Sequence, residues 1–330
     1  MNSVRLIIRL CCLLAISSAQ EIAPLEIPLT GPAANTEREM SGLTWYHDTL
    51  ILLPQHVSPA EPSFYRIPKA ALLQLLEQTP KSPIQPQPVS VALPDYQREI
   101  PGYEGLEAIS FDGNTVYLTL EAKNEGNMLG YLVKGTIDPV TWTITINPNS
   151  RVTLNPPVNI KNMAYEALLV YHHSLVAFYE ANGRQVNSNP HAEHYSTNLK
   201  PLAPFQFPTI EYRITDVTTV DDRGNFWAIN YYWPGEAEFL RPAVDLLAKR
   251  FGRGPTHRQT EYVERLVQFQ FTPEGITLTL TPPIQIALDL REPRNWEGLV
   301  RLDDKGFLMI TDEYPRTILA FVPYPANSSE

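Results

Sequence analysis

An internal repeat constrains this sequence more than any other feature, because a pattern that recurs five times indicates five copies of one structural unit. Each copy opens on a polar residue, continues as an apolar strand, turns, and returns as a second strand with a polar end. The clearest copy runs from Asn295 to Glu313, with its turn at Asp303 to Gly306. The other four copies begin near Met40, Tyr103, Tyr165 and Thr215.

Further strand candidates flank the hairpins and bring each unit to four strands. One group precedes the hairpins, at Leu25–Leu29, Val89–Leu93, Ser150–Leu154, Pro204–Phe207 and Ile284–Leu288. Four strands in each of five units, spaced by about fifty to eighty residues, predict an all-β, five-bladed β-propeller. The last unit lacks a fourth strand, so Leu25–Leu29 is expected to close the ring. A β-sandwich is the alternative, but it does not explain the five-fold register.

Composition narrows the possible partners. The 330-residue chain carries a formal net charge of -10, whereas a nucleic-acid partner normally requires a basic surface. We therefore expect no nucleic-acid partner.

The N-terminal segment reads as an export signal. Residues 1–19 combine arginines, an apolar run from Leu6 to Ile16 and a small-residue end at Ala19, as in secretory signal peptides. The alternative is a buried strand or a membrane anchor, but the run is too short to span a bilayer. We expect a secreted or periplasmic protein in which residues 20–330 form one propeller domain without a transmembrane segment. Both cysteines, Cys11 and Cys12, would leave with the signal.

Two segments break the strand pattern. Residues Pro68–Glu77 and Pro242–Phe251 place apolar side chains at helical spacing, which predicts two short helices inserted between strands. Their leucines are expected to pack against the propeller rather than contact a ligand.

One polar position recurs at the start of every inner strand. We call this set the inner column; it consists of Ser41, Glu104, Glu166, Asp216 and Glu297. The first strand of each propeller blade lines the central channel, so these side chains should form a ring around the axis. Four clustered carboxylates repel one another unless a cation lies among them. Ca²⁺ accepts six to eight oxygen ligands in irregular geometry, so we predict an axial calcium site. A water-filled channel without metal is the alternative.

A second polar position recurs where the second strands end. We call this set the second column; it consists of Gln55, Glu121, Glu180, Asn230 and Asp312. If these side chains point inward, they orient the metal ligands or contact substrate; if they point outward, they only cap strands in water. The inward orientation is our prediction, because five polar residues in register are a rare coincidence.

Short phrases in the inner strands resemble those of calcium-centred propellers. The phrases are Tyr103-Glu104-Gly105-Leu106-Glu107-Ala108-Ile109, Trp296-Glu297-Gly298-Leu299 and Met40-Ser41-Gly42-Leu43-Thr44. They resemble the five-bladed calcium-activated nucleotidase (apyrase) family, in which Glu and Ser side chains surround an axial Ca²⁺. They are also similar to the esterase-like phytase domain family. The resemblance implies a calcium-dependent hydrolase of phosphate or other esters. The expectation of a small-molecule partner, either anionic or an ester, rests on this resemblance and not on composition.

Roles follow for individual residues under that hypothesis. Glu121 or Glu180 would act as general base, and Asn230 and Asp312 would contact substrate. Lys123, Arg184 and Arg316, just beyond second-strand ends, would bind an anion, although each could equally be a solvated loop charge. Two alternatives remain, namely a non-catalytic propeller with a structural calcium that binds a ligand or an envelope partner, and a lactonase, which the blade count disfavours.

Overall fold

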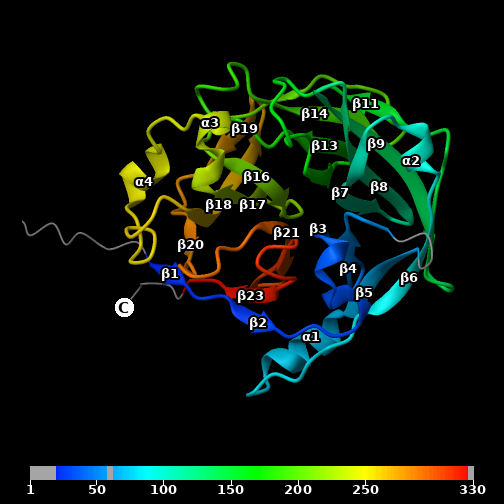
Figure 1. Ribbon diagram of the computed structural model, residues 1–330, viewed down its shortest axis with the longest axis horizontal. Helices are drawn as coiled ribbons and strands as arrows, with labels where there is room; N and C mark the ends of the chain where they lie inside the picture. The colour runs from blue at the N-terminus through cyan, green and yellow to red at the C-terminus, as the bar shows by residue number, and fades with distance from the viewer. Residues whose placement is uncertain (1–19, 58–61, 326–330) are drawn as a thin grey trace, which may run out of the picture.

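Five antiparallel blades surround a central axis in the computed structural model, which describes residues 20–57 and 62–325 (Figure 1). The predicted signal peptide, residues 1–19, lies outside the described residues. The innermost strands contact one another in the cyclic order β3, β7, β12, β16, β21 and back to β3. The chain is therefore the predicted five-bladed β-propeller, and a sandwich is excluded.

Each blade runs outward from the axis in chain order. Blade 1 consists of β3 (Met40–Tyr46), β4 (Thr49–Pro54), β5 (Ser63–Pro68) and β6 (Gln87–Ala92). Blade 2 consists of β7 (Tyr103–Asp112), β8 (Thr115–Asn124) and β9 (Asn127–Asp138), with β10 (Thr143–Ile146) and β11 (Val152–Leu154) both pairing with β9. Blade 3 consists of β12 (Ala167–Tyr171), β13 (Ser174–Phe178), β14 (His191–Ser196) and β15 (Phe205–Gln206).

The last two blades complete the ring. Blade 4 consists of β16 (Arg213–Val217), β17 (Asn225–Tyr232), β18 (Val263–Thr272) and β20 (Ile284–Ile286), with β19 (Gly275–Leu278) paired to β18 and β1 (Glu21–Ile22) to β20. Blade 5 consists of β21 (Trp296–Leu302), β22 (Gly306–Thr311), β23 (Leu319–Pro323) and β2 (Leu25–Ile27). β2 pairs antiparallel with β23, so the N-terminal strand closes the ring as predicted, and this closure protects the last blade's edge.

The core occupies the five wedges between neighbouring blades. In β4, Leu50 and Leu52 pack toward blade 5, whereas Ile51 and Leu53 pack toward blade 2. Successive side chains of a strand point to opposite faces, and both faces are covered here. The middle strands therefore read as continuous apolar runs rather than as alternating patterns.

The helices lie outside the ring of strands (Figure 1). α1 (Lys69–Leu76) buries Leu72 and Leu75, which confirms the expected packing. α4 (Leu246–Phe251) starts after the N-cap Asp245, later than predicted, and ends before Gly252 with φ 81°. Leu247 packs against a core cluster, which agrees with the expected packing, whereas Leu246 is 60% exposed and no residue of α4 is fully buried. The short helices α2 (Tyr96–Glu99) and α3 (Ala237–Leu240) were not predicted. No described helix is long and apolar enough to cross a membrane.

Four of the five inner strands, all except β12, share one irregularity that shapes the axial site. The pairing with the second strand shifts at Ser41 in β3, at Glu297 in β21 and between Ile214 and Val217 in β16. β7 shifts twice, at Glu104 and at Glu107. A bulge of this kind bends the strand and redirects the extra side chain. Four residues of the inner column therefore lie at bulges, and Glu166, just before the regularly paired β12, does not.

Candidate functional site: an acidic cavity on the propeller axis

A cavity of about 820 Å³ opens around the axis at one end of the ring. Its size lies in the range of small-molecule sites. All five blades or the loops after them contribute to the wall, and most of the charged groups are carboxyl groups. The charged lining consists of Glu39, His56, Glu104, Glu107, Glu121, Glu166, Arg213, Glu236, Glu297, Asp312 and Glu313.

The inner column divides in the structure. Glu104, Glu166 and Glu297 line the cavity, whereas Ser41 and Asp216 do not. The Ser41 hydroxyl donates a 2.7 Å hydrogen bond to the Leu106 carbonyl. Asp216 accepts hydrogen bonds from its neighbour Val217 N at 2.7 Å and from Leu299 N of β21 at 2.6 Å. These two side chains therefore tie inner strands together, and the predicted five-residue ligand ring does not assemble.

The register prediction was wrong in blade 2. Inner strands end five residues after Ser41, Glu166 and Glu297, and β7 ends five residues after Glu107, not after Glu104. Glu107 lies at the second bulge of β7, is 3% exposed and lines the cavity. Counting back from the turn would have identified it, whereas the match of Glu104-Gly105-Leu106 to Glu297-Gly298-Leu299 concealed it.

The second column points into the axial cavity in three blades, at Gln55, Glu121 and Asp312. Its five side chains are buried or half-buried, and Gln55 Nε2 donates a 3.0 Å hydrogen bond to Glu107 Oε1. Glu121 and Asp312 line the cavity directly. Glu180 and Asn230 are both fully buried and do not line it, so direct contact with substrate does not fit these two residues.

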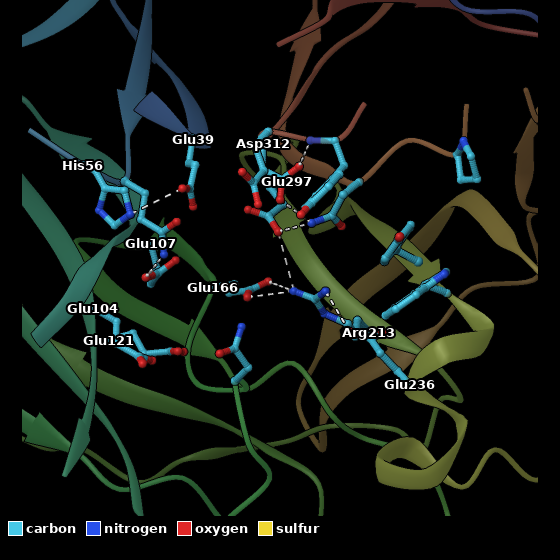
Figure 2. Close-up of a pocket in the computed structure, with 18 of the residues that line it drawn as sticks. Glu39, His56, Glu104, Glu107, Glu121, Glu166, Arg213, Glu236, Glu297 and Asp312 are labelled. Atoms are coloured by element: carbon cyan, nitrogen blue, oxygen red, sulfur yellow. Dashed lines mark hydrogen bonds and ion pairs between the residues drawn. The ribbon is translucent and has the colours of Figure 1, made fainter. Parts of the chain in front are cut away.

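Arg213 of β16 is the buried cation of the cavity, and the sequence prediction missed it. Its guanidinium contacts four carboxyl groups: Glu166 at 2.9 Å, Glu180 at 2.5 Å, Glu236 at 3.3 Å and Glu297 at 3.7 Å. Figure 2 shows Arg213 with Glu166, Glu236 and Glu297. Burial acts to lower the pKa of Arg213, but these carboxylates raise it well above its usual value. The arginine is therefore permanently charged.

One guanidinium cannot compensate four carboxylates. Burial raises the pKa of Glu166 well above its usual range although Arg213 opposes it, and burial and Asp312 do the same for Glu297. A buried carboxyl group without its own cation lowers the free energy of the fold by keeping a proton. On the Arg213 side of the cavity, burial therefore favours the protonated forms of Glu166 and Glu297.

The blade 2 side carries three glutamates and no guanidinium. Glu104 and Glu121 lie side by side, with Glu107 across from them (Figure 2), and Glu121 shares a hydrogen bond with Glu104. Burial raises the pKa of Glu107 to about 8. It also raises the pKa of Glu121 well above its usual value, with a further contribution from the Glu107 charge. Glu107 is therefore a proton donor at neutral pH.

Asp312 differs from Glu107 because it has more hydrogen-bond donors. Tyr314 N donates to its Oδ1 at 2.8 Å, and Asn295 Nδ2 donates to its Oδ2 at 2.7 Å. Asn295 Nδ2 also donates to Glu297 Oε1 at 2.6 Å. Burial raises the pKa of Asp312 only to about 6 because the donors oppose it. At neutral pH Asp312 is thus mostly ionised, whereas Glu107 is still mostly protonated.

The three cations predicted to bind an anion lie elsewhere. Within the described part of the chain, Lys123, Arg184 and Arg316 are all absent from the axial wall. Arg316 forms a 2.8 Å ion pair with Glu26 at the surface, and Arg184 lines a different cavity. The prediction that they act at this site is corrected: Lys123 still belongs to β8, where it pairs with Met128 of β9, and none of the three side chains reaches the axial wall.

Aromatic side chains complete the wall. Tyr231, Trp233, Tyr262 and Tyr314 line the cavity, and Trp233 and Tyr314 are 48% and 61% exposed. Exposed rings at the mouth of a polar cavity provide flat apolar surfaces for a ligand while their polar atoms stay in water.

Whether the axial cavity suits a metal ion depends on its donor set. Among residues 20–57 and 62–325, no group of three or more His, Cys, Asp or Glu side chains is arranged to hold a metal. Two members of the predicted ring, Ser41 and Asp216, bond to backbone groups instead. One buried oxygen, Glu104 Oε2, has no hydrogen-bond partner. In this arrangement the predicted ring does not fit Ca²⁺.

Comparisons with known proteins concern the fold alone. No family model and no curated protein sequence matches this chain. A glycosyl hydrolase from Bacteroides ovatus has 11% identity and a TM-score of 0.46, with 94% of this chain and 91% of that chain covered. A Cellvibrio cellulosa alpha-L-arabinanase has 10% identity and a TM-score of 0.46, with 88% and 94% covered. An exo-beta-1,3-galactanase from Phanerochaete chrysosporium has 10% identity and a TM-score of 0.49, with 91% and 66% covered. Likenesses this distant carry no conclusion about activity.

Proposed function

We propose that this propeller is a hydrolase that cleaves a glycosidic bond with the carboxyl groups of its axial cavity. The observation that carries the proposal is the pair Glu107 and Asp312, two carboxyl groups lining one cavity. Their pKa values are raised to different levels, about 8 and about 6. Glycoside hydrolysis requires one protonated and one ionised carboxyl group.

Each residue has a defined role in this proposal. Glu107 donates its proton to the leaving-group oxygen, with Gln55 Nε2 orienting its carboxyl group. Asp312, held by Asn295, removes a proton from water or attacks the sugar carbon. The transition state carries positive charge on the ring, which a carboxyl-lined cavity stabilises. Trp233 and Tyr314 offer faces on which a sugar ring stacks.

The charge of the cavity argues against a phosphate substrate in this arrangement. All three guanidinium nitrogens of Arg213 already contact carboxyl groups. His56 also lines the wall, but burial lowers its pKa. A phosphate dianion therefore finds no unpaired cation in the described wall, whereas a neutral polyol incurs no such repulsion.

The test is hydrolysis of nitrophenyl and alkyl glycosides by the wild-type chain and by Glu107→Gln, with Arg316→Gln as a surface control. Loss of a general acid costs about 10²- to 10⁴-fold in kcat. The loss should be larger for alkyl glycosides, because nitrophenolate leaves without a proton. Cleavage of aryl phosphates or carboxylic esters but not of glycosides would overturn the proposal, as would an equal loss on both leaving groups.

The calcium-dependent ester or phosphate hydrolase predicted from sequence is the second candidate. The unpartnered Glu104 Oε2 beside Glu121 favours it, because a hard cation would satisfy that oxygen. Metal-stripped protein should then gain several degrees in Tm with Ca²⁺ but not with Mg²⁺, and Glu104→Gln should abolish the gain. A gain in Tm without hydrolysis of any substrate class would favour a binding propeller with structural calcium. No gain would exclude the calcium site.

A further inference from the structure

A second cavity, of about 330 Å³, lies outside the ring beside blades 3 and 4. Its walls are the loop at Arg184, the segment Thr209–Glu211, the segment Ala243–Phe251 that contains α4, and the end of β19. It shares no lining residue with the axial cavity. We call it the lateral cavity.

The lateral cavity has an apolar floor and an apolar rim. Ile210 is buried, and Leu247 and Leu278 pack against the same core cluster. At the rim, Leu246 is 60% exposed and Leu280 is 73% exposed. Exposed apolar side chains gathered around a hollow are uncommon on a soluble surface and indicate a binding site. This placement also explains why α4 has no fully buried side chain.

The carboxylates in the wall are already occupied. Asp245 pairs with Arg265 at 2.8 Å and accepts the N–H groups of Leu247 and Ala248 at the start of α4. Glu211 accepts a hydrogen bond from Arg184 N at 3.2 Å on one oxygen and from Ala243 N at 3.0 Å on the other. Among the described residues, neither carboxylate forms an ion pair with Arg184 or Arg250.

Two arginines at the cavity remain without a carboxylate partner among the described residues. They are Arg184, in the loop after β13, and Arg250, in α4. The Arg250 guanidinium lies 5.0 Å from the centre of the Phe251 ring. With Arg265, three arginines face two carboxylates here, although the whole chain has a net charge of -10. The lateral cavity is therefore locally suited to an anion.

We propose that the lateral cavity binds an alkyl carboxylate of medium chain length. Arg184 and Arg250 bind the carboxylate, for which the planar guanidinium is well matched. Leu246, Leu247 and Leu280 surround the alkyl chain. This binding is independent of the axial cavity and of glycoside hydrolysis.

The proposal is tested by calorimetric titration of the full chain with decanoate, decanol and acetate. Decanoate should bind with one site per chain and about tenfold or more tighter than decanol, which lacks the charge, or acetate, which lacks the chain. Arg184→Gln should weaken decanoate binding by about tenfold to a hundredfold, because a charge-assisted hydrogen bond is lost. Arg316→Gln, a surface arginine outside both cavities, is the matched control and should bind as the wild type does.

Three outcomes would overturn the proposal. The first is no binding of decanoate, and the second is equal binding by the wild type and by the Arg184→Gln/Arg250→Gln double variant. The third is binding of anionic phospholipid vesicles without binding of monomeric decanoate, which would instead indicate a membrane-docking surface. Both arginines are exposed, so the variants should fold, and circular dichroism checks this. A Leu280→Asp variant should independently abolish binding.

Discussion

Blade 4 contributes a buried arginine to each of the two cavities, and the two arginines have different surroundings. Arg213 contacts four carboxyl groups in the axial cavity, whereas Arg265 pairs with Asp245 alone in the lateral cavity. Burial acts to raise the pKa of Asp245, but Arg265 and the N–H groups of α4 hold it below its usual value. In the axial cavity the effect of burial exceeds that of Arg213, and the pKa of Glu166 is raised.

This difference shows that the ratio of cations to carboxyl groups sets protonation more than burial does. One guanidinium keeps one buried carboxylate ionised, but it cannot do so for four. A cluster with excess carboxyl groups holds protons that it can donate. The axial cavity is suited to acid–base chemistry for this reason, and the Asp245–Arg265 pair is structural.

The largest expected effect comes from Arg213→Met. Removing the guanidinium leaves Glu166 and Glu180 buried without a cation, which should cost about 3–5 kcal/mol of unfolding free energy at neutral pH. Urea denaturation measures this loss. Arg316→Met, in an exposed ion pair with Glu26, should cost less than about 1 kcal/mol. Equal small losses for the two variants would contradict the compensating role of Arg213.

Asp245→Asn should change the unfolding free energy less, and it tests the ion pair between Asp245 and Arg265 in the lateral cavity. Asparagine still caps α4, so only the charge opposite Arg265 is lost, and the expected cost is about 2–3 kcal/mol. The folded pKa of Asp245 is lowered, so its stabilisation is present above the unfolded pKa and is lost as pH falls through the folded value. The variant should therefore approach wild-type stability as the pH falls through the folded pKa of Asp245.

The control for this variant is Asp289→Asn. Asp289 is exposed, and its carboxylate accepts backbone N–H groups from Arg291 and Glu292, as Asp245 does at α4, but no guanidinium is paired with it among the described residues. Its replacement should change the unfolding free energy by less than about 1 kcal/mol. If Asp245→Asn and Asp289→Asn change the unfolding free energy equally at neutral pH, the Asp245–Arg265 ion pair contributes nothing to stability.

Glu107→Gln should show the opposite pH dependence with the smallest amplitude. The folded pKa is raised to about 8, so the folded state keeps a proton that the unfolded state has lost. The stabilisation is present below the unfolded pKa and is lost as pH rises through the folded value. Glutamine avoids that loss, which for an isolated group would amount to about 4 kcal/mol between pH 5 and pH 9. Because neighbouring glutamates share the proton, we expect the variant to gain only about 1 kcal/mol relative to wild type. Glu104 and Glu121 take over part of the proton uptake, which keeps the difference small. Thermal melts at both pH values measure it, and a relative loss at pH 9 would contradict the account.

The fold was predictable from sequence because its signal repeats. Five hairpins and an unpaired N-terminal segment specify both the ring and its closure by β2. Most of the acidic wall was predictable for the same reason. Glu107 was missed because β7 carries two bulged glutamates three residues apart. Only the number of residues to the following turn shows which of the two matches the position in the other blades.

Other features depend on contacts that no local pattern records. Arg213 reaches Glu166 and Glu180, which precede it by 47 and 33 residues and lie in another blade. A lone arginine in the otherwise apolar start of β16 was the available signal. The position of Arg184 in the lateral cavity likewise depends on how α4 lies against the outer strands, and the sequence of α4 alone predicted ordinary packing.

The most direct test of the account is the protonation state of Glu107 in the folded protein. Carbon-13 labelling of the glutamate carboxyl groups, with Glu107 assigned by its loss in Glu107→Gln, allows its titration to be followed by nuclear magnetic resonance. The account predicts a midpoint at about pH 8, so that Glu107 is protonated at neutral pH. A midpoint at the usual glutamate value of about 4.3 would contradict it and leave the axial cavity without its proton donor.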